Sequence, residues 1–346
     1  MVLLLTADEV GPLLDMRQAI DLLEAVAREH GAGTASEIPS MGGSKRGSLR
    51  LLGGSTGDPA RAGLRVGLHG AVSLLFDATT WEPLAVMGAP FSRLRVGASA
   101  GVAARFLARP DASSVAMLGS GKNALAILSG LCAVRPIQRA AVYSPNAEHR
   151  GAFARQASAE VGIPVEPADA RDEALHEADI VAVMTNAVSP VLSAEDLRPG
   201  WHVSSLGMET ELDASVYLRA DQFVATTREL EIYNTDPASN PPSRQVPPLY
   251  RLLHEGRIES ERMIPLGDIV SGRTAARNGP GDVTVYRDSR AGTHEVAFLS
   301  YVYDRARERG LGVEFDLGSE ARSAWRPSSR PRATRGSDQV PALADG

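Results

Sequence analysis

The order of hydrophobic and polar residues divides the first third of the chain into two patterns. Residues 6–29 repeat apolar side chains at the spacing of an amphipathic helix. Residues 47–87 instead predict short strands separated by Gly, Pro and Asp, with a hairpin at 74–87 that turns near residues 77–82. An alanine-rich helix is expected at 92–107, ending before Pro110.

Beyond residue 113 the pattern changes to alternating strands and helices. Strands are expected at 115–118, 140–143, 180–184, 202–205 and 222–225, with helices that begin near Asn123, Ala147, Asp172 and Ser193. This order predicts an α/β fold with a Rossmann-type, doubly wound parallel sheet, which binds ligands at the carboxyl ends of its strands. A last helix is expected at 293–309, before a Ser-, Arg- and Pro-rich tail, residues 318–346, which we expect to be disordered.

The segment 114–125 carries a G-x-G-x-x-A motif between the first of these strands and its helix. Gly119 permits a tight turn, Gly121 lets the backbone approach a pyrophosphate, and Ala124 lets the helix pack on the strand. With Ser120 and Asn123, these residues are the predicted phosphate cradle at the start of a helix. The alternative is an ordinary glycine turn of an α/β domain.

The end of the second strand bears on the choice between NAD and NADP. NAD-selective domains place an Asp or Glu there to bind the ribose hydroxyls, whereas this chain has Ser144, Pro145 and Asn146. Ser144, Asn146 and Arg150 predict a site that accepts a 2′-phosphate, so NADP(H) is favoured over NAD(H). Glu148 argues against this, and Arg150 has an alternative role as a surface residue.

Composition narrows the class of protein and its partners. The net charge of −6, with 43% hydrophobic and 23% charged residues, predicts a globular protein without a general nucleic-acid or membrane surface. No apolar run approaches the roughly 20 residues of a membrane span, and the first residues lack a basic signal-peptide region. One cysteine excludes an internal disulfide and a cysteine metal cluster, and no metal site is predicted. A cytoplasmic location is the default expectation.

Several segments together resemble the ornithine cyclodeaminase/μ-crystallin family, from residue 1 to about residue 317. They include Leu-Leu-Phe-Asp-Ala at 74–78, Ser-Arg-Leu-Arg-Val-Gly-Ala-Ser at 92–99, the glycine loop at 118–124, and segments 106–112, 134–137, 178–181, 185–192, 197–203 and 303–312. The resemblance implies a Rossmann domain at 113–292 and an α+β substrate and dimerisation domain built from residues 1–112 and about 293–317. It also implies a homodimer and an NAD(P)-dependent enzyme of small amino or imino acids.

The resemblance also implies which residues hold the substrate carboxylate. Arg95 matches the family's arginine before the glycine loop, with a surface arginine as the alternative. Arg65 stands where the family usually has lysine, and a guanidinium is a poorer proton shuttle. A further family arginine is replaced by Ser40, unless Arg46 or Arg50 substitutes for it.

The loops expected around the nicotinamide match the family better than the proton-handling loop does. Thr185 and Asn186 follow one strand, and Ser205 and Gly207 close the next. After Gly207 the loop is shorter than in cyclodeaminases and lacks their Asp, the residue that handles the substrate amine.

Three side chains near these segments have open roles. Glu209 can reach the space of the missing Asp, or Glu209 and Glu211 are simply solvated carboxylates. His294 is expected at the surface of the last helix, with a cleft position as the alternative.

These observations predict an NAD(P)H-dependent oxidoreductase acting at a C–N bond, with Arg65, Arg95 and Glu209 as candidate catalytic residues. It would reduce a small imine or ketimine carboxylate, or oxidise an amino acid. One alternative is a binding or accessory protein of the family that keeps the NADP(H) pocket without turnover. The other is a cyclodeaminase that uses Glu209 in place of the family's Asp.

Overall fold

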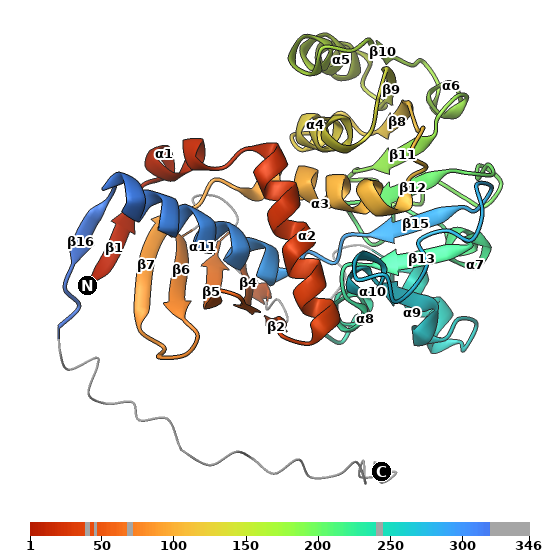
Figure 1. Ribbon diagram of the computed structural model, residues 1–346. Coiled ribbons are helices and arrows are strands. Elements are labelled where there is room, and N and C mark those ends of the chain that lie inside the picture. The colour runs from red at the N-terminus through yellow and green to blue at the C-terminus, as the bar shows by residue number, and fades with distance from the viewer. Residues whose placement is uncertain (39–41, 45–46, 68–71, 240–244, 319–346) are drawn as a thin grey trace, which may run out of the picture.

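The computed structural model describes residues 1–38, 42–44, 47–67, 72–239 and 245–318 of the 346-residue chain, with 42–44 and 47–50 as backbone only. Figure 1 shows two sheets side by side, with α2 (Met16–Ala32) and α3 (Ser92–Leu107) between them. The predicted α/β fold is confirmed. The tail expected to be disordered lies, apart from its first residue, outside the described part of the chain.

The first sheet is mixed and runs in the order β16-β1-β7-β6-β5-β4-β2, with β3 paired to β4. Among the described pairs of this sheet, only β1–β7 is parallel. Its strands come from both ends of the described chain: β1 (Val2–Leu5), β2 (Ser36–Ile38), β3 (Gly42–Ser44), β4 (Gly47–Gly57), β5 (Ala60–Val66), β6 (Val72–Asp77), β7 (Pro83–Gly88) and β16 (Val313–Phe315).

The second sheet is parallel throughout, in the order β10-β9-β8-β11-β12-β15-β13-β14. The chain leaves β8 toward β9 on one side and returns to β11 on the other, so the crevice between β8 and β11 is the point where ligands bind in doubly wound sheets. Its strands are β8 (Ser114–Leu118), β9 (Arg139–Tyr143), β10 (Val165–Pro167), β11 (Ile180–Val183), β12 (His202–Ser205), β13 (Gln222–Ala225), β14 (Met263–Pro265) and β15 (Thr284–Arg287).

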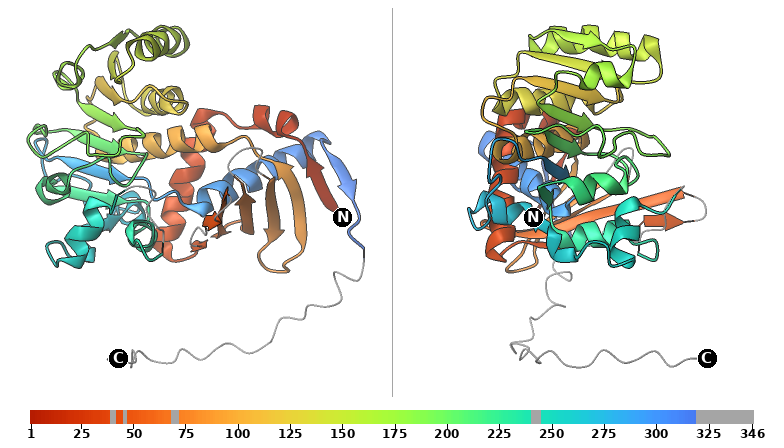
Figure 2. Two further views of the ribbon diagram at one scale, coloured as in Figure 1. Left: turned by 180° about the vertical axis from the view of Figure 1, so that it is seen from behind. Right: turned by 90° about the vertical axis from the view of Figure 1, so that its right-hand side faces the viewer.

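Helices cover one face of the mixed sheet and flank the parallel sheet (Figure 2). The long α11 packs on β4 and β5, and α3 packs on both α2 and α4. The remaining helices are α1 (Ala7–Val10), α4 (Ala124–Val134), α5 (Ala147–Val161), α6 (Arg171–Leu175), α7 (Ala214–Arg219), α8 (Arg228–Thr235), α9 (Pro248–His254), α10 (Leu266–Val270) and α11 (Gly292–Arg309), with short 3-10 turns at Gly11–Leu13 and Ser260–Arg262.

Local sequence explains where α2 begins and ends and how closely α3 packs on its neighbour. Asp15 caps α2 in a reciprocal box with Gln18, and Gly33 ends the helix in the left-handed conformation at φ 74°. Where α3 crosses α4, a Cβ added at Gly130 would clash with the carbonyl oxygen of Gly97. Glycine at this crossing therefore lets the two helix backbones touch, which fixes the parallel sheet against the rest of the molecule.

Three sequence predictions differ from the structure. The helix expected at 6–29 is divided, because a 3-10 turn containing Pro12 and the new N-cap at Asp15 separate α1 from α2. No helix begins at Ser193; residues 191–201 form turns, in which Ser193 donates its amide to Asp196 instead. The strands β1, β2, β3, β10, β14, β15 and β16 were not predicted.

Candidate dinucleotide and substrate site

The glycine loop between β8 and α4 has the backbone geometry that a pyrophosphate cradle requires. Gly119 has φ 115°, and a Cβ there would clash with the carbonyl oxygen of Met184. A Cβ at Gly121 would meet no described atom within 4 Å, so this glycine faces open space. Ala124 is buried at the start of α4, and Asn123 before it does not cap the helix with its side chain. The loop is thus packed closely against the protein at Gly119 and open at Gly121.

A hollow of about 660 Å³ lies over this loop at the carboxyl ends of β8, β9 and β11. None of the described residues that line it has a carboxylate side chain, which favours an anionic ligand. The lining residues are Leu118, Gly119, Ser120, Gly121, Tyr143, Ser144, Pro145, Asn146, His149, Arg171, Met184, Thr185, Asn186, Ala187, Pro190 and Val191. The loop and the hollow fit the pyrophosphate and ribose of a dinucleotide.

Of the polar residues expected to contact the cofactor at the end of β9, only some line the hollow. The hydroxyls of Ser120 and Ser144 are 2.8 Å apart, and Asn146 caps α5 by accepting the His149 amide at 2.8 Å. Arg150 is buried outside the lining of the hollow, where it donates to the Ser144 carbonyl at 3.2 Å and to Asp169 at 2.5 Å. The alternative of a surface arginine is therefore wrong for Arg150.

Two other basic residues, His149 and Arg171, do line this part of the hollow. Arg171 donates to Asp196 at 2.7 Å and to the Val191 carbonyl at 3.0 Å. Arg171 was not among the predicted site residues, because it follows a strand too short to have been predicted.

A buried carboxylate joins the two loops expected to flank the nicotinamide. Glu211 is fully buried and accepts hydrogen bonds from the Thr185 amide, from the Gly207 amide at 3.0 Å and from the Ser205 hydroxyl at 3.2 Å. Burial raises the pKa of Glu211. Arg287, also buried, donates to the Ser205 hydroxyl at 2.7 Å. The expectation that Glu211 is solvated is wrong, since the chain turns back under the loop and buries it.

Glu209 is likewise not a solvated carboxylate. It is 8% exposed and forms an ion pair with Arg290. Arg290 has a left-handed backbone at φ 56°, which is uncommon for a residue with a Cβ. The pair joins the loop after β12 to the loop between β15 and α11.

The two predicted substrate arginines meet at one carboxylate on α11. Glu295 Oε1 lies 3.4 Å from Arg65 Nη1 and 3.5 Å from Arg95 Nε. Arg95 Nη1 lies 3.4 Å from Asp288 Oδ2, and all four side chains are buried or nearly so. Arg95 is therefore not a surface arginine. Glu295 and Asp288 were missed because they are about 190 to 230 residues from the arginines they meet.

His294, expected at the surface, is 1% exposed and belongs to the same buried region. Burial lowers the pKa of His294 to about 4. The first amides of α11 donate to the Glu37 carboxylate, Gly292 at 2.7 Å and Thr293 at 3.3 Å. This cap draws the start of α11 into the protein.

Three residues considered for the third basic position of the carboxylate site cannot be compared with the structure. Ser40 and Arg46 lie outside the described residues, and Arg50 is described only as backbone. Within the described ranges, no group of three His, Cys, Asp or Glu side chains is arranged to hold a metal ion. No helix in those ranges has the length and apolar character that crossing a membrane requires.

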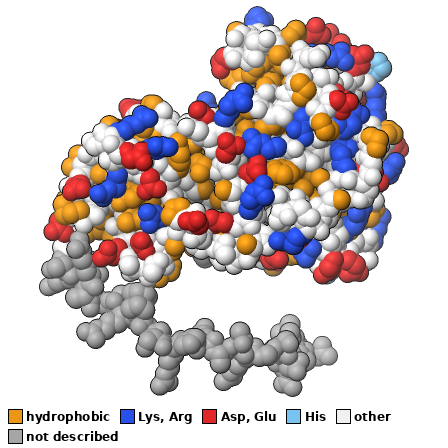
Figure 3. Space-filling view, in the orientation of Figure 1, with side chains coloured by type: hydrophobic (Ala, Val, Ile, Leu, Met, Phe, Trp, Pro, Cys, Tyr) orange, Lys and Arg blue, Asp and Glu red, His pale blue; other side chains and the backbone are white. Residues whose placement is uncertain are grey.

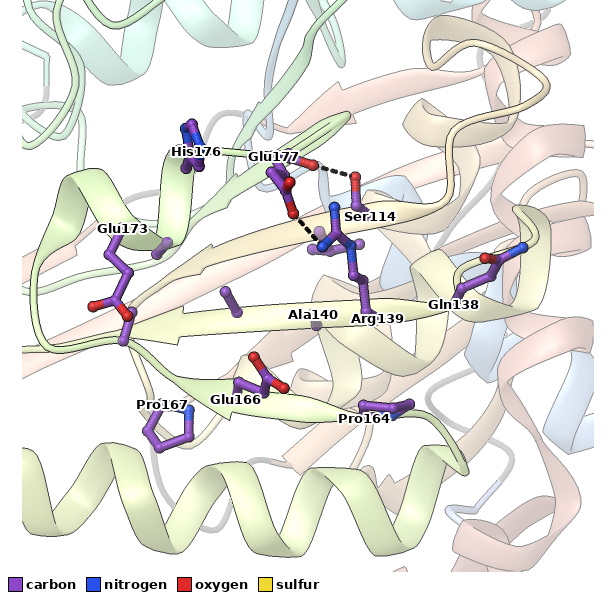
Figure 4. Close-up of a pocket in the computed structure, with 15 residues that line it drawn as sticks. Ser114, Gln138, Arg139, Ala140, Pro164, Glu166, Pro167, Glu173, His176 and Glu177 are labelled. Carbon is purple, nitrogen blue, oxygen red and sulfur yellow. Dashed lines mark hydrogen bonds and ion pairs between the residues drawn. The ribbon is translucent and has the colours of Figure 1, made fainter.

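A second hollow, of about 540 Å³, runs along β8, β9 and β10 (Figure 4). Glu166, Glu173 and Glu177 line it, and its Arg139 is ion-paired with Glu177. This acidic lining disfavours phosphates. The face shown in Figure 3 mixes acidic, basic and hydrophobic side chains, without a field of one sign.

The fold and the hollow over the glycine loop define a dinucleotide-binding α/β protein. Residues 2–310 match the ornithine cyclodeaminase/mu-crystallin family, and the chain belongs to that family. Its relatives include a Δ1-pyrroline-2-carboxylate reductase of Bacillus cereus, 32% identical over 251 residues, or 71% of this chain and 74% of the relative. The iminosuccinate reductase of Paracoccus denitrificans is 25% identical over 254 residues, 72% of this chain and 74% of its own.

Solved structures have the same fold over nearly the whole chain. The Thermococcus litoralis Δ1-pyrroline-2-carboxylate reductase, in complex with NADH and L-proline, superposes with a TM-score of 0.80 at 25% identity, covering 91% of this chain and all of that one (100%). An archaeal alanine dehydrogenase dimer with bound NAD gives a TM-score of 0.79 at 25% identity, covering 92% and 99%.

Proposed function

We propose that the protein is an NAD(P)H-dependent oxidoreductase that reduces a small imine or ketimine carboxylate, or oxidises the corresponding amino acid. The observation that carries the proposal is the pair of buried arginines, Arg65 and Arg95. The same chain has a hollow over its glycine loop, and no carboxylate is among the described residues that line this hollow. Paired guanidiniums suit a carboxylate, and the family's named activities act on amino and imino acids.

The protein's own residues supply position and charge in this reaction. Gly119 and Gly121 admit the dinucleotide, and Thr185 and Asn186 border the hollow beside it. When bound, the cofactor supplies or accepts a hydride. Arg65 and Arg95 would hold the substrate carboxylate, and burial of the cluster would keep water from the reacting carbon.

Following NADPH and NADH absorbance with cyclic imines, and with keto acid and amine mixtures, tests this proposal. We expect oxidation of the nucleotide by at least one imine carboxylate. Tight nucleotide binding without turnover of any of these substrates would instead support a binding protein of the family. Ring closure of ornithine with release of ammonia would support a cyclodeaminase.

We further propose that NADP(H) is preferred over NAD(H). Support comes from the absence of acidic side chains in the lining of the described hollow and from the basic His149 and Arg171 there. Replacing Arg171 with Gln should weaken NADPH binding more than NADH binding in a fluorescence titration. His176→Gln, at an exposed site outside this hollow, is the control. Equal losses for both nucleotides in Arg171→Gln would contradict the preference.

We also propose that the protein forms a homodimer through the mixed sheet. A cytoplasmic location is proposed as the default. The face of this sheet opposite α11 carries an apolar row across four strands, Leu4, Val86, Leu74 and Leu64, which are neighbours in register. Leu4 is 37% exposed, and the other three are partly exposed. Leu74→Glu should convert a dimer to a monomer in light scattering, whereas Val188→Glu, at an exposed site elsewhere, should not.

A further inference from the structure

Glu295 has one carboxylate oxygen in use and one without a partner among the described residues. Its Oε1 lies between Arg65 and Arg95, but its buried Oε2 accepts no hydrogen bond from them or from any other described group. Ser73, opposite Arg65 in the β5–β6 register, also has a buried hydroxyl for which the described chain offers no partner. Buried polar groups normally find partners. The Nε donors of Arg65 and Arg95 also form no hydrogen bond with described residues, so the cluster suits a ligand that both donates and accepts hydrogen bonds.

The charges of this cluster constrain that ligand. The two guanidiniums of Arg65 and Arg95 are matched by the two carboxylates of Asp288 and Glu295, so their formal sum is zero. A carboxylate alone would add an uncompensated negative charge to a buried region, which is costly. A ligand that carries both a carboxylate and a cationic nitrogen adds none.

The rival carboxylate, Glu209, is already committed to another cation. It pairs with Arg290 on the loop that precedes α11. A substrate amine at Oε1 of Glu209 would have to displace that guanidinium. No such exchange is needed at the second oxygen of Glu295, to which no described group donates.

We infer that Glu295 receives the cationic nitrogen of the substrate while Arg65 and Arg95 hold its carboxylate, so that the site selects zwitterionic imino and amino acids. This assignment rests on the proposed function. A nearby carboxylate favours the protonated imine, whose carbon is the better hydride acceptor. As the hydride adds to that carbon, the C=N π electron pair moves onto nitrogen, which keeps its proton and becomes a neutral amine.

Calorimetric binding of two probes of similar shape tests this assignment. L-Proline carries a carboxylate and a cationic nitrogen, whereas cyclopentanecarboxylate carries the carboxylate alone. The wild-type protein should prefer L-proline, and Glu295→Gln should lose about tenfold or more of that preference. Binding of cyclopentanecarboxylate should rise in this variant, because its cluster then carries a net positive charge.

Three controls separate the possible outcomes. Glu295→Asp keeps the charge and should keep part of the preference, and Glu209→Gln should keep all of it. Thermal melts and NADPH titration of each variant report whether the fold and the nucleotide site survive. A merely structural Glu295 would weaken both probes equally, which would overturn the inference.

Loss of the preference in Glu209→Gln but not in Glu295→Gln would also overturn it. If the wild-type protein binds both probes equally, the selection of zwitterions is wrong although carboxylate binding stands. If it binds neither probe, the inference is again wrong. If it discriminates between them but turns over no imine, only the proposed reductase activity fails.

Discussion

The proposed dinucleotide half of the site is built from neighbouring residues of one strand–turn–helix unit, whereas the proposed substrate half is assembled from distant parts of the chain. In the first, Gly119, Gly121 and Ala124 lie within six residues of one another. In the second, Arg65 and Arg95 from β5 and α3 meet Glu295 on α11. Ligand binding in the first half should depend mainly on backbone shape, and in the second half on buried charge. The two halves should therefore respond to different substitutions.

The largest effect is expected at Gly119. In Gly119→Ala, the positive φ and the contact with the Met184 carbonyl force the loop to move, and we expect NADPH affinity to fall about 100-fold or more. Fluorescence titration measures this. Gly162→Ala is the matched control, since it has φ 73° but no described neighbour within 4 Å. It should lower stability by about 1 kcal/mol and leave the affinity unchanged; equal losses of affinity in both variants would contradict a cradle at Gly119.

The next effect is expected in the substrate half. Arg95→Met should raise the Michaelis constant for a carboxylate substrate about 30-fold or more, while the dissociation constant of NADPH stays the same. Arg95→Lys, which keeps the charge, should recover part of the loss. Steady-state kinetics, at temperatures where melts show folded protein, provide the measurement. An unchanged Michaelis constant in Arg95→Met would remove this arginine from the substrate site.

His294 predicts a pH dependence of stability. Its pKa in the folded state is about 4, below the usual 6.5, because burial disfavours the charged imidazole. As the pH falls below 6.5, the unfolded state binds a proton that the folded state does not, so stability is lost. Between about pH 7 and about pH 5 the expected contribution is about 2 kcal/mol. Urea unfolding of His294→Gln should show a weaker acid dependence by this amount, whereas the exposed-site variant His176→Gln should match wild type.

The smallest effect is expected at the junction of the two halves. In Glu211→Gln, an amide group must face the Thr185 and Gly207 amides, so the loops should shift and kcat/KM should fall about tenfold. Glu231→Gln is the matched control. Glu231 is equally buried and pairs with Arg287 at 3.1 Å. The described contacts give it no hydrogen bond from the Thr185 or Gly207 amide, and it reaches the loop through Arg287, which donates to the Ser205 hydroxyl. If Glu231→Gln lowers kcat/KM as much as Glu211→Gln does, the fall reflects lost charge balance rather than loop position.

The contrast between local and distant contacts also explains which features could be predicted from the sequence. The strands at 115–118, 202–205 and 222–225 and the helix at 92–107 were predicted within a residue, because their periodicity is local. The surface position expected for His294 was wrong, and so was the alternative of a solvated Glu211, since their burial depends on the Glu37 cap of α11 and on the loops at Thr185 and Gly207. Such tertiary contacts leave no local pattern in the sequence.

In the proposed reaction the two halves form one site, in which a hydride passes between the nucleotide and the carbon of a C–N bond. Incubation with NADPH that carries deuterium at its transferable position, together with Δ1-pyrroline-2-carboxylate, tests this directly by mass spectrometry of the product. We expect one deuterium on the α-carbon of proline, and a product level that falls in Arg95→Met. Unlabelled proline, or no reduction of this or any other imine carboxylate, would contradict it.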